Sequence, residues 1–384
     1  MLIIAALALA IWLYLLLFRG GFWLSNVGDV SVDPRMLPAP LTDYPRIVAV
    51  VPARNEADSI AASLDSLLKQ AYPGSFSIVL VDDNSEDATA EIARRLAQDH
   101  PGSPLTILSG APLPHGWTGK LWAVRQGIAE AAKSNPDYLL LTDADIVYEP
   151  GVLSWLAGHS VRGNYVLTSL MAKLRCQSLA ERSCIPAFIY FFQMLYPFAW
   201  VNDPRRSMAA AAGGCMLVRA DALAQAGGID AIRDALIDDC TLGQALKRQG
   251  PIWLGLTDRV HSIRVSDKFA DIHAMVSRSA YAQLRYSPLL LAGTVAGMLL
   301  TYLAAPAAIL SGIPAAQALG LATWGLMAAT FWPTLRFYGL SPLWGLALPA
   351  IAGAYMAFTI SSAIQHSLGR GGRWKGRSQA KQIA

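Results

Sequence analysis

Uncharged, apolar segments fill both ends of the chain, whereas the middle alternates between apolar and polar stretches. Charged residues are absent from 1–18, from 287–335 and, apart from one histidine, from 337–369. A helix needs about 20 apolar residues to cross the hydrocarbon core of a membrane. We therefore predict an N-terminal transmembrane anchor within residues 1–20 and about three transmembrane helices within 288–366. The individual segments are Leu2–Phe18, Leu289–Leu310, Ala316–Leu335 and Leu343–Ile364.

Between residues 45 and 286, short apolar runs alternate with amphipathic stretches. Strands are expected at 47–52, 76–82, 105–109 and 138–142, and helices at 59–69, 88–98 and 121–133. Short buried strands separated by helices are typical of an α/β fold with a mostly parallel sheet and helices on both faces. In such sheets, ligands bind beyond the carboxyl ends of the strands.

A further apolar stretch, residues 185–201, lies inside this α/β region. A transmembrane helix there would leave acidic residues of the two halves of the region on opposite sides of the membrane. The stretch also contains Pro186 and Pro197 and is shorter than a typical span. We therefore predict interfacial helices near 185–201 that lie in the plane of the membrane surface.

Acidic and polar residues follow three of the predicted strands. The segments are Pro52–Glu56, Asp82–Ser85 and Asp143–Asp145. Carboxylates that converge on one edge of a sheet repel one another unless a cation or a donor-rich ligand occupies the site. A ligand site at this edge is therefore predicted, and three solvated turns are the alternative.

Asp143 and Asp145 form a pair of carboxylates separated by one residue. Hard oxygen ligands of this kind suit Mg²⁺ or Mn²⁺, which also bind phosphate oxygens. Such a metal would stabilise the negative charge that develops on a departing diphosphate.

Five other residues are candidates for the same chemistry. Asp238 and Asp239 begin a helix-like run, where they are either favourable first-turn carboxylates or a general base. Lys120 precedes a helix and either contacts phosphate or is solvated. Gly213 and Gly214 permit close approach of the backbone to a sugar, or form a turn.

Composition and charge limit the possible classes of protein and its possible location in the cell. A hydrophobic fraction of 54% with 15% charged residues is too apolar for an ordinary soluble enzyme, and a net charge of +4 does not suggest nucleic-acid binding. The four cysteines form no disulfide-like framework. Arg19, directly after the first apolar segment, favours an uncleaved anchor over a signal peptide and places the middle region in the cytoplasm. We predict a multi-pass protein of the cell inner membrane.

The basic tail, residues 367–384, conflicts with this topology. Its basic residues should remain inside, whereas three C-terminal spans would place them outside. Either one apolar segment is re-entrant or the positive-inside rule is broken. The basic residues are Arg370, Arg373, Lys375, Arg377 and Lys381.

The ordered set of motifs resembles the family 2 glycosyltransferases of the Rossmann-like GT-A fold. The matching segments are Val50–Glu56, Val81–Thr89, Thr142–Asp145, Gly213–Cys215 and Asp238–Leu246. Within that family, the chain is most similar to the hopanoid-biosynthesis-associated glycosyltransferases, relatives of ceramide glucosyltransferases. Gly116–Lys120, Gln283–Pro288 and the membrane layout carry this closer resemblance.

The resemblance implies a role for each motif. Asp239 would be the catalytic base of an inverting displacement, and Asp238 stands where the family has Glu. Asp143 and Asp145 would bind the metal. Arg285 and Tyr286 replace the Arg-Trp pair of related enzymes. The residues implied in nucleotide-sugar binding are Pro52, Arg54, Glu56, Asp82, Asp83, Lys120, Asp143, Gly213, Gly214 and Arg285.

These features together predict an enzyme that moves one sugar from a nucleotide-sugar, expected to be a UDP-sugar, to a lipid hydroxyl at the cytoplasmic membrane face. A hopanoid is one candidate acceptor. The alternatives are a processive polysaccharide synthase, a nucleotidyltransferase, and a non-catalytic membrane scaffold with a degenerate nucleotide-sugar-binding fold. An incomplete Arg-Trp motif argues against the first, and the lack of a glycine-rich phosphate loop after the first strand argues against the second.

Overall fold

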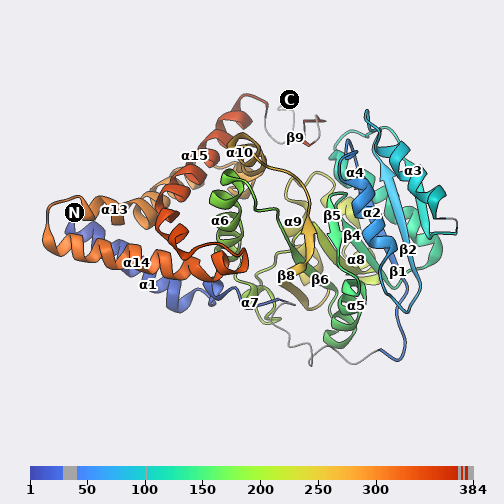
Figure 1. The fold of residues 1–384 in the computed structure, drawn as a ribbon, viewed down its shortest axis with the longest axis horizontal. Helices are drawn as coiled ribbons and strands as arrows, with labels where there is room; N and C mark the ends of the chain where they lie inside the picture. Colours follow the sequence, from blue (N-terminus) through green and yellow to red (C-terminus); the bar gives the residue numbers. More distant parts are fainter. Residues whose placement is uncertain (29–40, 101, 371–372, 375–376, 379–384) are drawn as a thin grey trace.

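A computed structural model describes residues 1–28, 41–100, 102–370, 373–374 and 377–378. An α/β region lies at one end and a group of apolar helices at the other, with helix α6 (Leu179–Leu195) between them (Figure 1). Lys375 and Lys381 of the predicted basic tail lie outside the described residues.

The α/β region is built on a mixed sheet, which has eight strands within the described residues, in the order β3-β2-β1-β4-β7-β6-β8-β5. β1, β2, β3 and β4 are mutually parallel, as are β6 and β8, whereas β7 and β5 run antiparallel to their neighbours. The strands are β1 (Ile47–Ala53), β2 (Phe76–Asp82), β3 (Leu105–Ser109), β4 (Tyr138–Thr142), β5 (Ile146–Tyr148), β6 (Leu167–Lys173), β7 (Cys215–Arg219) and β8 (Ile252–Ser262). The predicted α/β fold with a mostly parallel sheet is confirmed.

Helices cover both faces of the sheet because successive strand side chains point in opposite directions. Val48 and Val50 of β1 belong to the same buried cluster as residues of α4, whereas Ala49 and Val51 belong to the cluster that contains α2. A Cβ atom at Gly127 of α4 would lie 2.4 Å from Val50, so glycine permits the close packing of this helix on β1. The helices of this region are α2 (Ile60–Leu68), α3 (Thr89–Asp99), α4 (Gly119–Ala131), α5 (Val152–Gly163), α7 (Phe198–Val201), α8 (Ala220–Gln225), α9 (Asp238–Lys247), α10 (Phe269–Ser277) and α11 (Ala280–Gln283).

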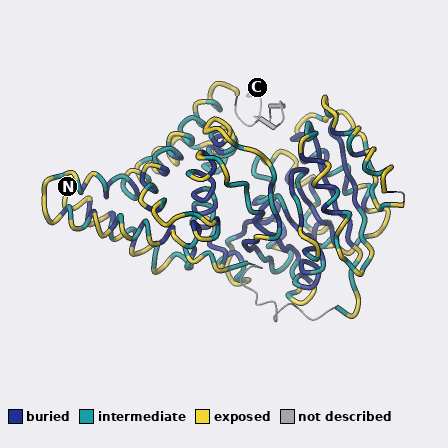
Figure 2. Tube along the Cα trace, viewed as in Figure 1, coloured by how far each residue is buried: buried dark blue, intermediate teal, exposed yellow. Residues whose placement is uncertain are grey.

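The apolar helices lie together although they come from both ends of the chain. The Trp12 indole of α1 donates a hydrogen bond to the Thr301 carbonyl oxygen (2.8 Å), which joins the two ends. Large apolar side chains are exposed on the outside of this group, where Figure 2 shows yellow and teal helices beside the dark blue sheet. The elements are α1 (Leu2–Phe18), α12 (Pro288–Met298), a π-helical segment (Leu299–Leu303), α13 (Ala304–Ile309), α14 (Pro314–Phe337) and α15 (Leu348–Ser367).

Among the described residues, three helical segments are long and apolar enough to cross a membrane. They are Leu179–Val201, Pro288–Ile309 and Pro342–Ser367. The second and third coincide with predicted spans. The first contains the segment predicted to be interfacial, and its helix begins earlier than expected, at Leu179. The other two predicted spans form helices as well, α1 with 17 residues and α14 with 24.

Helix α6 is one contact between the two parts of the molecule, beside the contacts of α10 and α11 with α15. The Tyr190 hydroxyl lies 2.8 Å from the Thr330 hydroxyl of α14, and the Tyr355 hydroxyl of α15 donates to the Cys184 carbonyl oxygen (2.9 Å). Tyr190 also packs against Phe331, with ring centroids 5.1 Å apart. Helix α6 is thus packed against α14 and α15.

Candidate active site

A cavity of about 540 Å³ lies at the carboxyl ends of β1 and β4 and at the amino-terminal ends of α4 and α9. Helix amino termini carry a partial positive charge, so this placement favours an anionic ligand. The cavity brings together most of the residues predicted from the sequence. These are Pro52, Glu56, Lys120, Asp143, Asp145, Gly213, Gly214, Asp238 and Asp239.

Lys120 lies at the centre of the carboxylates. Its Nζ is 2.8 Å from Asp143 Oδ1 and 3.1 Å from Asp238 Oδ2. Thr118 caps α4 and holds Lys120 in the first helical turn, where a cation is unfavourable by itself. Burial would lower the pKa of Lys120, but the charges of Asp143 and Asp238 outweigh it and raise that pKa above its ordinary value. Lys120 is therefore a charged partner of two acidic groups.

Asp239 is held by the backbone. Its Oδ2 accepts a hydrogen bond from the Gly213 amide (3.0 Å), and its Oδ1 accepts one from the Cys240 amide (2.7 Å). Burial raises the pKa of Asp239 to about 6, and the charge of Asp238 adds to this effect while Lys120 opposes it. A carboxylate with such a pKa is a stronger base than an ordinary aspartate and is still ionised at neutral pH.

Asp145 has a different set of partners. Its Oδ2 accepts hydrogen bonds from the Ser262 hydroxyl (2.8 Å) and from Arg264 Nε (3.1 Å). Arg264 Nη2 donates to Glu56 Oε1 (3.0 Å), so one guanidinium connects the acidic segments that follow β1 and β4. Arg264 was not predicted from the sequence, since it comes two residues after β8 and 119 residues after Asp145.

Part of the surroundings of Asp143 and Asp145 suits a divalent cation. Asp143 is 34% exposed to the cavity, whereas Asp145 is 8% exposed and bound by Arg264. Within the described part of the chain, no three His, Cys, Asp or Glu side chains form a common metal cage. Mg²⁺ and Mn²⁺ that bind together with a substrate phosphate need only one or two carboxylates. The Asp143–Asp145 pair meets that requirement.

Four predicted residues do not line the cavity. Arg54 is buried, and its Nη1 donates to the Asp83 carbonyl oxygen (2.6 Å) and to the Asn84 carbonyl oxygen (2.8 Å). Asp82 and Asp83 are buried at the end of β2. These residues shape the edge of the sheet beside the cavity. Arg285 is exposed in the connection between α11 and α12 and is not among the residues around the cavity.

Part of the cavity lining is apolar, although Asp271 and Arg278 also border the cavity. The apolar part comes mainly from α6 and α10, with contributions from the segments after β6 and β8. Its residues are Leu174, Phe188, Phe192, Val265, Ala274 and Met275. The cavity is therefore amphipathic, with most of its charged residues at the sheet edge and most of its large apolar residues on α6 and α10.

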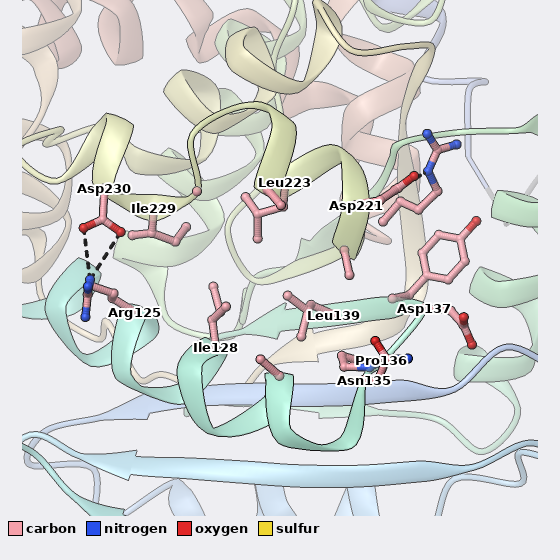
Figure 3. A pocket seen from close by; sticks show the side chains of 16 residues that line it. Arg125, Ile128, Asn135, Pro136, Asp137, Leu139, Asp221, Leu223, Ile229 and Asp230 are labelled. Carbon is pink, nitrogen blue, oxygen red and sulfur yellow. Dashed lines mark hydrogen bonds and ion pairs between the residues drawn. The ribbon is translucent and has the colours of Figure 1, made fainter.

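A second cavity, of about 660 Å³, lies at the opposite end of the sheet (Figure 3). It is lined by α4, α8 and the residues that precede and begin β4. Two ion pairs border it: Arg125 Nε lies 3.0 Å from Asp230 Oδ1, and Arg219 Nε lies 2.7 Å from Asp221 Oδ1. This cavity has the larger volume but none of the predicted site residues.

Comparison with known proteins finds similar glycosyltransferases. The sequence profile described as Glycosyl transferase family 2 matches residues 48–227. The chain is 29% identical over 106 residues to "Probable glycosyltransferase YdaM" of Bacillus subtilis (strain 168), which covers 27% of this chain. It is 36% identical over 140 residues to "N-acetylglucosaminyltransferase" of Rhizobium leguminosarum bv. viciae, which covers 36% of this chain. The matches span 24% and 30% of the lengths of these relatives.

One solved structure resembles nearly the whole chain. The mannosyltransferase PcManGT from Pyrobaculum calidifontis, determined in complex with GDP-Man and Mn²⁺, is 20% identical. The likeness covers 95% of this chain and 98% of that chain, with a TM-score of 0.54. At this identity, the likeness supports the fold.

Proposed function

We propose that this chain, whose residues 48–227 match the profile of glycosyl transferase family 2, is a membrane-bound inverting glycosyltransferase. It transfers a sugar from a nucleotide-sugar to a lipid acceptor. The observation that carries the proposal is the amphipathic cavity, which places Asp239, the Asp143–Asp145 pair and an apolar wall around one space.

The proposed reaction is a single displacement. The oxygen of the acceptor hydroxyl attacks the anomeric carbon of the sugar while the bond from that carbon to the diphosphate oxygen breaks. The electron pair of the broken bond leaves with the nucleoside diphosphate, and the hydroxyl proton passes to the Asp239 carboxylate. The amides of Gly213 and Cys240 orient that carboxylate, and its raised pKa suits proton transfer. One displacement inverts the anomeric configuration.

The donor's diphosphate fits the charged side of the cavity. The amino termini of α4 and α9 and the side chain of Lys120 all face this space and favour an anion. Asp143 and Asp145 would hold Mg²⁺ or Mn²⁺, which neutralises charge on the leaving diphosphate when bound. The similar structure that contains GDP-Man and Mn²⁺ makes GDP-sugars worth testing beside UDP-sugars.

The acceptor's apolar body fits the side formed by α6 and α10. Helix α6 packs against the apolar helices at Tyr190 and Cys184, so a lipid held among those helices would have its apolar body beside the cavity that contains Asp239. We place the α/β domain on the cytoplasmic face of the cell inner membrane. The resemblance noted from the sequence makes a hopanoid the first lipid to test.

The test is release of nucleoside diphosphate by the full chain, purified in detergent, from a panel of UDP- and GDP-sugars with Mn²⁺ or Mg²⁺. We expect release with one donor that depends on an added lipid extract and disappears when EDTA removes the metal. Mass spectrometry of the lipid should show the mass of one added sugar. Release that is independent of lipid would contradict the lipid acceptor, and a folded protein that releases nothing from any donor would contradict the proposal.

A further inference from the structure

We infer that, in the ligand-free protein, Lys120 pairs with the Asp143 carboxylate and Arg264 with the Asp145 carboxylate. Both cationic side chains then move to the donor's diphosphate when it binds. The metal site is then opened by the donor itself, so that metal and donor bind together. The inference rests on the proposed function for the identity of the donor.

Each carboxylate of the metal-binding pair already has a cationic partner. Asp143 Oδ1 is 2.8 Å from Lys120 Nζ, and Asp145 Oδ2 is 3.1 Å from Arg264 Nε. A divalent cation beside either carboxylate would meet a positive charge at hydrogen-bonding distance. Like charges at such separations repel strongly in a partly buried site. The metal therefore binds weakly until both cations have moved.

Arg264 cannot leave without replacement. Asp145 is 8% exposed and Glu56 is 11% exposed, and Arg264 is a partner of both. An uncompensated carboxylate in such a place is costly. A metal ion that arrives as Arg264 departs would supply the missing positive charge. Departure of the arginine and arrival of the metal are therefore favourable only together.

A diphosphate is a suitable new partner for both side chains. Arg264 divides its guanidinium between two residues, with Nε on Asp145 and Nη2 on Glu56. A phosphate group offers the paired oxygens that a guanidinium binds best. Lys120 and Arg264 both line the cavity, and the Arg264 side chain is 45% exposed, so it has room to turn.

Reciprocal coupling follows from this exchange. If a nucleoside diphosphate increases the affinity for metal by a given factor, the metal increases the affinity for the nucleoside diphosphate by the same factor. Measured couplings between sites are commonly about tenfold, and we expect a factor of that order here.

The experiment measures Mn²⁺ binding to the full-chain protein in detergent by electron paramagnetic resonance, with and without UDP or GDP and without any sugar transfer. In the wild-type protein, Mn²⁺ affinity should rise about tenfold when the nucleoside diphosphate is present. In Arg264→Gln, Mn²⁺ should bind several-fold more tightly without nucleotide, and the effect of the nucleotide should fall. Arg264→Lys keeps the positive charge and should lie between the two.

Arg259→Gln is the matched control. Arg259 lies on β8 close to Arg264, pairs with Glu149 (3.8 Å), and is not among the residues around the cavity. This variant should bind Mn²⁺ like the wild type. Lys120→Met removes the other cation independently. This variant should also bind Mn²⁺ more tightly than the wild type without nucleotide.

Two results would overturn the inference. One is wild-type Mn²⁺ affinity that is the same with and without a nucleoside diphosphate that does bind. The other is unchanged Mn²⁺ affinity in folded Arg264→Gln and Lys120→Met. Failure of sugar transfer would contradict the proposed function but leaves both measurements valid, because neither uses turnover. A protein that binds no nucleoside diphosphate at all would contradict the exchange, while the metal-only comparison would still decide whether the two cations block the metal.

Discussion

The two ends of strand β4 face cavities of similar size but opposite character. At the carboxyl end, the cavity of about 540 Å³ gathers two pairs of aspartates, a lysine and two helix amino termini. At the amino end, the cavity of about 660 Å³ is bordered by the separate Arg125–Asp230 and Arg219–Asp221 ion pairs and by apolar residues of α4 and α8. The second cavity is the larger of the two, whereas acidic groups converge only at the first.

The difference follows from the topology of the sheet. β1, β2 and β4 are parallel, so the loops that follow them meet at one edge, and the helices that cover them point their amino termini toward that edge. The opposite edge receives helix carboxyl termini and turns, which provide no comparable field for an anion. The comparison predicts that changes at the carboxyl end alter turnover and that changes at the amino end do not.

The largest effect is expected from Asp239→Asn. This substitution keeps the size of the side chain but removes the base, so turnover should fall by roughly 10²–10⁴-fold. Nucleoside diphosphate binding, measured by isothermal titration calorimetry, should remain within a few-fold of wild type. Normal turnover in this variant would show that another group accepts the proton.

The pH dependence of turnover should report the ionisation of Asp239. Because the pKa of Asp239 is raised to about 6, the carboxylate is ionised above that pH and becomes protonated below it. Turnover at saturating substrate should therefore fall about tenfold per pH unit below pH 6 and level off above pH 7. A profile that falls only below pH 4, where an ordinary aspartate titrates, would contradict this assignment.

A smaller effect is expected at the apolar wall of the same cavity. Phe188→Asn places an amide where an acceptor's apolar body should lie, and it should raise the KM for the lipid about fivefold without changing the KM for the donor. Phe188→Leu keeps an apolar side chain and serves as its control. Equal increases in both KM values would indicate a general disturbance of the cavity.

The smallest effect is expected at the amino end. Asp230→Asn removes one partner of an exposed ion pair, so the free energy of unfolding should change by less than about 1 kcal/mol. Turnover should stay within about twofold of wild type, since surface substitutions of this kind rarely propagate. A loss of turnover as large as that of Asp239→Asn would break the comparison and give the larger cavity a part in the reaction.

Much of the fold could be predicted from the sequence because each buried strand is a short apolar run. The predicted strand 76–82 and β2 have the same bounds, as do 105–109 and β3. The antiparallel placement of β7 beside β4 was not predicted, since pairing direction depends on the path of the chain between the strands. That path includes α5, β6 and α6, and the residues of β7 itself carry no pattern that indicates the direction in which it pairs.

The site was predictable to the extent that it consists of residues at strand and helix ends. Asp143 follows a recognisable apolar run, Asp239 begins a helix-like run, and the two line one cavity in the structure. Arg264 has no such signal, because a charged residue in a polar segment after a strand is usually solvated. The pairing of β5 with β8, in which Ile146 is opposite Ser262, brings it to Asp145. Arg54 shows the reverse case, since its motif suggested a ligand contact while its guanidinium bonds to backbone carbonyl oxygens.

The position of α6 limits how this protein can be truncated or recombined with its relatives. The helix presents Phe188 to the cavity, while Tyr190 and Cys184 are covered by α14 and α15. The catalytic region and the apolar helices therefore share one wall and are not separable modules. Truncation after residue 287 would uncover the buried apolar face of α6, so a soluble fragment should aggregate rather than retain a working cavity. Exchange of the α/β region between relatives should succeed only when α6 and its covering helices are exchanged together.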